Sequence, residues 1–147
     1  MATATNDRIG KVTTTITVTN RIDQILAERG FIPPEQIRSV TLKDVLVDTG
    51  ATRLCLPANI INELGLVLQG EVDVKIATGL QKLRIFREIN LAVEGREGTF
   101  NCMELPNDAE PLLGLIPLED LGLEPDLQNQ RLRVLPSEGK DTYLTVL

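Results

Sequence analysis

The sequence predicts an all-β protein, mainly strands with two short helices, on three observations. Runs rich in Val, Ile and Thr alternate with Gly, Pro and Asn along most of the chain, which is typical of strands joined by turns. Only 3% of the residues are aromatic while 42% are hydrophobic, so Leu, Ile and Val must fill the core. Two short apolar stretches, at 58–64 and 117–121, are each followed by a Gly that can end a helix. We expect one domain over residues 11–147, after a flexible leader at residues 1–10.

The strands are predicted from their β-branched residues and from the alternation of polar and apolar side chains. They cover residues 11–20, 40–47, 71–77, 80–86, 87–93, 99–105, 131–135 and 142–147. We place the turn between the third and fourth of these strands at Thr78 and Gly79. Residues 21–39 separate the first two strands, with a short helical stretch over 21–30 and a further turn after two prolines. This segment is therefore an insertion in what would otherwise be a plain hairpin.

The composition excludes several classes of site. The net charge of −6 argues against nucleic-acid binding, which requires a basic face. The chain has no His, and neither of its two Ser lies in a GxSxG motif. Ser-His-Asp and Cys-His catalysis are therefore excluded, and the commonest metal ligand is missing. No Gly-rich phosphate loop is present. We expect neither a metal nor a cofactor, and carboxylate chemistry remains.

The two cysteines and the first residues bear on the cellular compartment. Cys55 and Cys102 are flanked by apolar residues. We interpret them as buried free thiols, with a disulfide or a reactive thiol as the alternatives. Residues 1–10 lack the apolar segment of a signal peptide, and no run is long enough to span a bilayer. A cytoplasmic protein without membrane contact is the resulting expectation.

Residues 41–57 contain the main candidate for a catalytic group. Val45 to Val47 predict a buried strand that leads directly into Asp48. A carboxylate at the tip of a buried strand is costly unless it is hydrogen-bonded, paired or catalytic. Asp-Thr-Gly is also a common turn sequence, and the tripeptide alone favours a structural turn.

The segment Leu46–Ala51, Leu-Val-Asp-Thr-Gly-Ala, resembles the active-site loop of the retropepsin-like aspartic proteases. The resemblance implies a retropepsin-like closed β-barrel, the acid-protease fold with one lobe per chain. It also implies that Asp48 is the catalytic carboxylate. Thr49, Gly50 and Ala51 would complete the active-site loop, and Thr49 would help to lock two such loops together across a two-fold axis.

A weak internal repeat supports this resemblance. The order strand, Gly, Pro, helix, Leu-Gly-Leu occurs from Leu46 to Leu66 and again from Leu112 to Leu123. The second copy carries Leu112, Leu113 and Gly114 in place of the Asp-Thr-Gly loop. Leu and Gly are common residues, but their shared order makes chance the weaker explanation. One Asp-Thr-Gly loop and one apolar-apolar-Gly motif is the pattern of the retropepsin fold.

The family also has a flap, a hairpin turn that covers the substrate. The resemblance places the flap at Ala77, Thr78, Gly79 and Leu80, with Gly79 as its flexible point. This turn lacks the run of glycines found in viral enzymes.

Two further differences indicate which members of the family the chain resembles. In viral members an Arg follows the Gly of the second motif and pairs with an acidic residue after Asp-Thr-Gly-Ala. Here these positions are Leu115 and Thr52, so both partners are replaced together. The resemblance is therefore to cellular, bacterial, single-domain members. The insertion at about 21–39 has no family role that can be transferred.

The resemblance implies a homodimer that acts on a peptide or protein substrate. In the family two Asp carboxyls share one proton, so that one activates water and the other protonates the substrate carbonyl. This chain has a single Asp-Thr-Gly, so the second carboxylate would be Asp48 of a second copy. Leu54, Ile76, Leu80 and Ile116 are candidates for lining the cleft, and core packing is an equally good account of each. The alternative is a catalytically silent binding or scaffold module with the same fold.

Overall fold

The computed structural model describes residues 11–136, and this part of the chain is mainly β. The strands are β1 (Val12–Asn20), β2 (Ser39–Val47), β3 (Leu54–Pro57), β4 (Val67–Ile76), β5 (Gly79–Val93), β6 (Arg96–Leu105), β7 (Leu112–Leu113), β8 (Leu123–Asp126) and β9 (Arg131–Val134). The helices are α2 (Arg21–Glu28), the 3-10 turn η1 (Pro34–Gln36), α3 (Ala58–Leu64) and α4 (Leu115–Leu121). The mainly β expectation is confirmed. The fold class was expected to have two short helices, whereas the described residues form three short α-helices. The third is α2, which falls in the helical stretch expected over residues 21–30.

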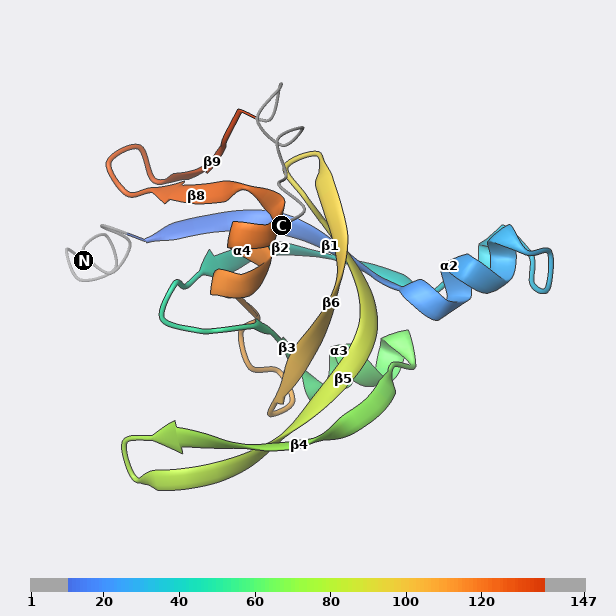
Figure 1. Ribbon diagram of the computed structural model, residues 1–147, viewed down its shortest axis with the longest axis horizontal. Helices are drawn as coiled ribbons and strands as arrows, with labels where there is room; N and C mark the ends of the chain where they lie inside the picture. Colours follow the sequence, from blue (N-terminus) through green and yellow to red (C-terminus); the bar gives the residue numbers. More distant parts are fainter. Residues whose placement is uncertain (1–10, 137–147) are drawn as a thin grey trace, which may run out of the picture.

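The larger sheet closes on itself (Figure 1). Its strand order is β1-β2-β7-β3-β6-β5-β4, and β1 also pairs with β5. The pairings from β1 through to β5 therefore run in a ring, and β4 extends from β5 as an edge strand. β7 pairs with β2 in parallel and β3 pairs with β6 in parallel, whereas the other pairings are antiparallel. Strands β8 and β9 form a separate two-stranded sheet.

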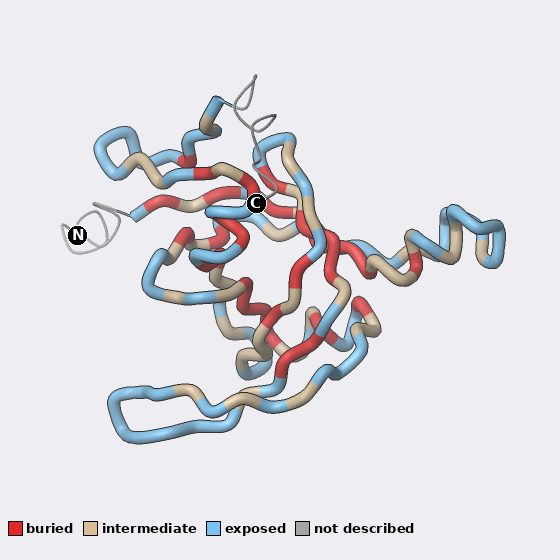
Figure 2. Tube along the Cα trace, viewed as in Figure 1, coloured by how far each residue is buried: buried red, intermediate tan, exposed pale blue. Residues whose placement is uncertain are grey.

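One hydrophobic cluster holds the ring together (Figure 2). Its largest members are aliphatic, as the scarcity of aromatic residues predicts, and each such side chain contributes about 1.5–3 kcal/mol when fully buried. The largest fully buried side chains are Ile16, Leu54, Leu56, Ile61, Leu64, Ile89, Leu91, Leu113 and Leu118. They come from β1, β3, β5 and β7 and from both α3 and α4.

Residues 80–86 and 87–93, expected as two strands, form the single strand β5. Glu88 adopts a φ of 65°, and the register between β5 and β6 shifts between Phe86 and Ile89. The irregularity is a bulge, which bends a strand without ending it. β5 can therefore pair with β4 along its first half and with β1 and β6 along its second half.

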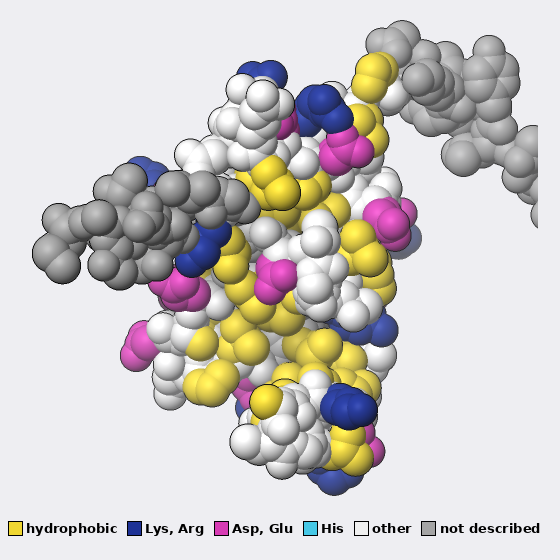
Figure 3. Space-filling model, turned by 90° about the vertical axis from the view of Figure 1, so that its left-hand side faces the viewer, with side chains coloured by type: hydrophobic (Ala, Val, Ile, Leu, Met, Phe, Trp, Pro, Cys, Tyr) yellow, Lys and Arg dark blue, Asp and Glu magenta, His cyan; other side chains and the backbone are white. Residues whose placement is uncertain are grey.

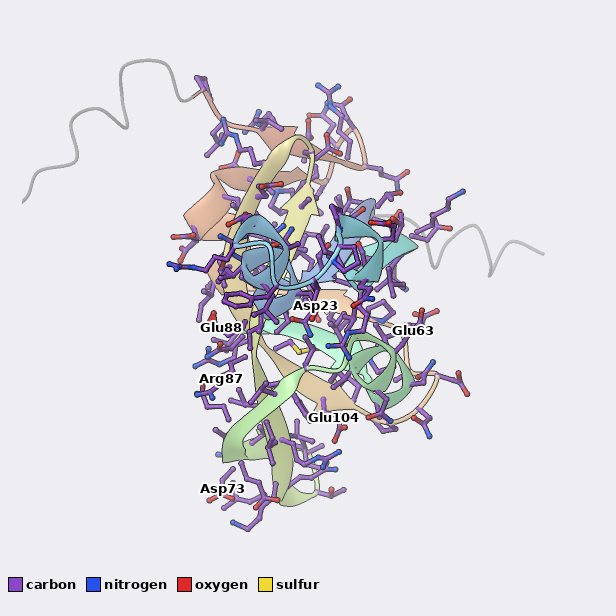
Figure 4. All side chains as sticks on the ribbon, turned by 90° about the vertical axis from the view of Figure 1, so that its right-hand side faces the viewer. Asp23, Glu63, Asp73, Arg87, Glu88 and Glu104 are labelled. Carbon is purple, nitrogen blue, oxygen red and sulfur yellow. The ribbon has the colours of Figure 1, made fainter. Side chains whose placement is uncertain are left out.

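The predicted insertion is an arm built from α2 and η1, which projects from one end of the molecule (Figure 1). Asn20 starts α2, because its side-chain oxygen accepts a hydrogen bond from the Asp23 N–H at 3.0 Å. Arg38 closes the arm: its backbone N and its Nε donate to Asp23 Oδ2 at 3.0 and 2.9 Å, and its Nη2 donates to Oδ1 at 3.0 Å. The Asp23 side chain is only 7% exposed; Figure 4 labels it in the arm. Hydrogen bonding from Arg38 lowers the pKa of Asp23.

Two expectations fall outside the described part of the chain: the leader at residues 1–10 and the strand at 142–147. Within residues 11–136, no helix combines the length and the apolar character needed to cross a membrane.

Candidate active site

Asp48 lies directly after β2, half-buried, at the start of a tight loop. Its backbone N–H donates to the Leu113 carbonyl at 2.9 Å, and its own carbonyl accepts from the Ala51 N–H at 3.0 Å. The Gly50 N–H donates to Asp48 Oδ1 at 2.9 Å. The loop therefore orients the carboxylate through its own backbone, in the manner of an Asx turn. Thr49 and Gly50 are exposed beside it.

The predicted second motif packs directly against this loop. Leu112 and Leu113 form β7, which pairs in parallel with the end of β2. The first two N–H groups of α4 are then bonded by the loop, since Leu115 N donates to Ala51 O at 2.8 Å and Ile116 N donates to Thr52 O at 2.9 Å. The structure thus brings together the two motifs that the sequence places more than sixty residues apart.

These contacts explain why α4 begins at Leu115 and not at Pro117, where the sequence places its start. A helix leaves its first N–H groups without partners inside the helix. Here the Asp48 loop accepts two of them, and the third helical residue is Pro117, which has no N–H to satisfy. The helix can therefore start at Leu115, the residue directly after Gly114.

The internal repeat extends to the ends of α3 and α4. Each helix ends at a Gly in the left-handed region, Gly65 with φ 63° and Gly122 with φ 68°. The carbonyls at each end are bonded by a side chain from the ring. Asn20 Nδ2 donates to Leu64 O at 2.8 Å, and Arg96 Nη1 donates to Leu121 O at 2.7 Å. Neither Asn20 nor Arg96 was identified from the sequence, because nothing local to them indicates a distant helix end.

The sheet face that carries Asp48 is apolar. In β2, Val45 and Val47 point into the core while Leu46 points to the opposite face, and Asp48 continues the alternation on that side. Residues that pair across two strands have their side chains on the same face of the sheet, so the register shows which residues of the neighbouring strands lie on the same face as Leu46. The members of this face, here named the Asp48 face, are Leu46, Cys55, Ile85, Met103 and Leu112. Figure 3 shows that side chains on this side of the molecule are largely hydrophobic.

The thiol of Cys55, which lies on the Asp48 face, interacts electrostatically with the Asp48 carboxylate. Burial first, and the Asp48 carboxylate second, raise the pKa of the Cys55 thiol to about 11. Burial likewise raises the pKa of Cys102 to about 12. Both cysteines are free and buried, as the sequence predicted. Both thiols therefore stay protonated at neutral pH and are not activated nucleophiles.

The predicted flap residues lie at the tip of the β4–β5 hairpin. Its two-residue turn is Ala77 and Thr78, one position earlier than expected, because Gly79 already pairs with Ile76 as the first residue of β5. Gly79 has a φ of 129°, which favours glycine, and Leu80 is 73% exposed. The hairpin and the loop between β2 and β3 lie at the same end of the molecule, opposite the arm (Figure 1).

The hairpin has one apolar and one charged face. Val72 pairs with Leu83, and these side chains continue the Asp48 face outward from Ile85. On the other face Asp73 accepts from Lys82 at 3.2 Å. The side of the hairpin that is continuous with Asp48 is therefore the apolar one.

The candidates for lining a cleft divide into two groups. Leu54 has no exposed surface and belongs to the core, so the cleft assignment is wrong for it. Ile76, Leu80 and Ile116 are 40%, 73% and 38% exposed, so their side chains are accessible to a ligand. Leu80 pairs with Lys75, however, and therefore lies on the charged face of the hairpin, away from Asp48.

A separate hollow of about 420 Å³ adjoins the Asp48 loop at Thr49. Thr49 lines it, together with residues of α4 and β8 and with Leu135. It lies beside the loop and does not contain the carboxylate.

The described residues hold no group of three His, Cys, Asp or Glu side chains placed to bind a metal ion. In comparisons with known proteins, no family model matches the chain and no curated protein matches it. The candidate site therefore stands on its own geometry.

Proposed function

We propose that the chain is an aspartic endopeptidase of the retropepsin-like type, which acts as a homodimer and hydrolyses peptide bonds between two Asp48 carboxylates. The observation that supports it most is the geometry of the Asp48 loop. The carboxylate follows a strand in which Val45 and Val47 are buried, its Oδ1 accepts the Gly50 N–H, and β7 and α4 hold the loop from behind. A turn residue with a structural role alone would not require this support from a second motif.

The proposed mechanism needs two carboxyls close enough to share a proton. A charge next to another of the same sign is disfavoured, so one carboxyl of the pair stays protonated. The ionised Asp48 takes a proton from water as the water oxygen bonds to the carbonyl carbon of the substrate, and the protonated Asp48 of the second copy donates a proton to the carbonyl oxygen. When this tetrahedral intermediate collapses, the hydroxyl proton returns to a carboxylate, the C–N bond breaks, and the leaving amine takes a proton from the other carboxyl. Thr49 and Gly50 are exposed at the loop tip, where a second loop could approach.

The proposed substrate is an extended peptide that lies along the Asp48 face. The apolar side chains of that face and of the hairpin would contact the side chains of the peptide. The hairpin tip, with Gly79, would act as the flap that excludes water during the reaction.

The test is hydrolysis of a mixed peptide library, followed by mass spectrometry at mildly acid and neutral pH, with Asp48→Asn as the matched control. Asn keeps a side-chain oxygen that can accept the Gly50 N–H, so the loop should retain its conformation. We expect the variant to lose activity by about 10³-fold or more, because it lacks the general acid and base. Full activity in the variant would show that the site is assigned wrongly. An inactive wild type whose Asp48 loops still meet in a dimer would instead favour the scaffold module.

A further inference from the structure

Among the described strands, β4 has β5 as its only neighbour, so one of its edges is free. The stretch from Glu71 to Ile76 is regular and contains no Pro, and most of its residues are exposed. Upstream, a register shift between Leu68 and Gly70 interrupts the edge. An exposed, regular edge presents unpaired backbone groups and can pair with another strand. β4 therefore offers about six residues for strand addition.

The turn determines which residues point their backbone groups to the free edge. In a hairpin with a two-residue turn, the flanking residues Ile76 and Gly79 exchange backbone hydrogen bonds, and bonded and non-bonded pairs then alternate. Val74 accordingly turns its backbone groups towards β5. Asp73 and Lys75 turn theirs outward, so these two residues would bond an added strand.

We propose that β4 pairs antiparallel with β4 of a second copy of this chain, with the two-fold axis at Val74. This register places Asp73 opposite Lys75 of the second copy, and by symmetry Lys75 opposite Asp73. Both pairs combine outward-facing backbone groups with opposite charges. Opposite charges on facing residues stabilise a sheet, whereas like charges destabilise it.

The neighbouring symmetric registers lack this charge complementarity. With the axis at Asp73, the two Asp73 carboxylates would face each other. With the axis at Lys75, the two ammonium groups would do so. With the axis at Val72, Asp73 would face Glu71 of the second copy. Only the register at Val74 pairs every charge near the axis with one of opposite sign.

The other face of the hairpin supports the same register. There Val74 would face Val74 of the second copy, and Val72 would face Ile76. Ile76 is 40% exposed in the single chain, and this pairing would cover it. On the charged face, the existing contact between Lys82 and Asp73 would continue to Lys75 of the second copy as a row of alternating charge. Figure 4 shows Asp73 on the hairpin, away from Asp23 and the arm.

The interface is separate from the Asp48 loops, although it uses the hairpin that is also the proposed flap, and it does not depend on the proposed activity. If both interfaces form, each chain has two two-fold contacts, and the assembly is larger than a dimer. If only the β4 interface forms, the protein is a dimer whose Asp48 carboxylates do not meet.

The first test is sedimentation velocity of the full chain over a range of concentrations. Asp73→Lys and Lys75→Asp each replace two attractive pairs with two repulsive ones, so each should raise the dissociation constant of the β4 interface about tenfold or more. Mixing the two variants places two Lys opposite two Asp and should restore the larger species. Circular dichroism of each variant checks that the fold is retained. If the variants sediment like wild type, or if their mixture does not recover, the proposal is wrong.

The second test is disulfide trapping under mild oxidation. Val74→Cys puts two thiols opposite each other at the axis, and it should give a covalent dimer on a non-reducing gel. Val72→Cys is the matched control, because in this register it faces Ile76 and should give no such dimer. The native Cys55 and Cys102 are buried and should not contribute. Trapping by Val72→Cys and not by Val74→Cys would overturn the register, and trapping by neither would show that β4 pairs with no second copy.

Discussion

Gly114 lies where the two motifs of the candidate site touch. A Cβ at this position would be 2.3 Å from the carbonyl oxygen of Arg53, 2.7 Å from that of Ala51, and 2.8 Å from the Arg53 nitrogen. All three neighbours are backbone atoms of the Asp48 loop, so no side chain can move aside. The absence of a side chain at Gly114 is therefore what allows β7 and α4 to support Asp48.

We predict that Gly114→Ala destabilises the protein by about 3 kcal/mol, because the loop or α4 must shift to admit the methyl group. Gly70→Ala is the matched control: a Cβ there meets nothing within 4 Å, and the expected change is within about 0.5 kcal/mol. Urea unfolding monitored by circular dichroism measures both. Equal stability of the two variants would mean that the close packing at Gly114 is not a constraint.

At the scale of single elements, the arm of α2 and η1 depends on the buried carboxylate of Asp23. The carboxylate accepts three hydrogen bonds from Arg38, whose side chain is half exposed. Because its folded-state pKa is lowered, Asp23 contributes stability above its unfolded-state pKa. That contribution is lost as the pH falls through the folded-state pKa.

We predict that Asp23→Asn costs about 2 kcal/mol at pH 7, the range for hydrogen bonds to a charged group. The difference between wild type and variant should shrink once the pH falls below the ordinary Asp pKa, where the unfolded wild-type chain takes up a proton. It should largely disappear below the lowered pKa of the folded state. Urea unfolding at several pH values measures this. Asp73→Asn removes the exposed pair with Lys82, and should change stability by no more than about 0.5 kcal/mol. A pH-independent cost for Asp23→Asn would rule out the carboxylate charge as its cause.

The β4–β5 hairpin is the element whose role separates enzyme from scaffold. Gly79→Ala introduces a Cβ at a φ of 129°, so we predict lower turnover with a stability change of no more than about 1 kcal/mol. Gly95→Ala, at another hairpin turn with a φ of 78°, should cost similar stability and leave turnover unchanged. Hydrogen exchange provides an independent measurement. If a tightly bound peptidic transition-state mimic left protection at residues 76–81 unchanged, this hairpin would not be the flap.

At the scale of the whole molecule, each chain supplies only one Asp-Thr-Gly carboxylate. A dimer of wild type with Asp48→Asn would contain one Asp48 and should be inactive. With a threefold excess of the variant, activity per wild-type chain should fall to roughly a quarter, as expected for random exchange between two-fold partners. Peptide hydrolysis after mixing and equilibration measures this. Activity that simply followed the amount of wild-type chain would show that one chain is sufficient.

Features set by neighbouring residues could be predicted from the sequence. Residues 58–64 form α3 with the expected bounds, because Gly65 adopts the left-handed conformation that ends a helix. The turn at Asp48 could be predicted in the same way, since the two hydrogen bonds that close it, from the Gly50 N–H and the Ala51 N–H to Asp48, lie within four residues. By contrast, β3 and β8 were not predicted as strands. Each has four residues, too few for periodicity to distinguish a strand from an irregular segment.

The sequence by itself determined the mainly β character, the buried free thiols and the position of Asp48 in a turn after a buried strand, because these follow from composition and local conformation. Tertiary structure decided the start of α4, the continuity of β5 and the apolar face around Asp48. The start of α4 depends on the carbonyls of Ala51 and Thr52, and the Asp48 face on pairings between strands far apart in the chain. Hydrogen bonds and sheet register between distant segments leave no local pattern, so they become visible only when the chain is folded.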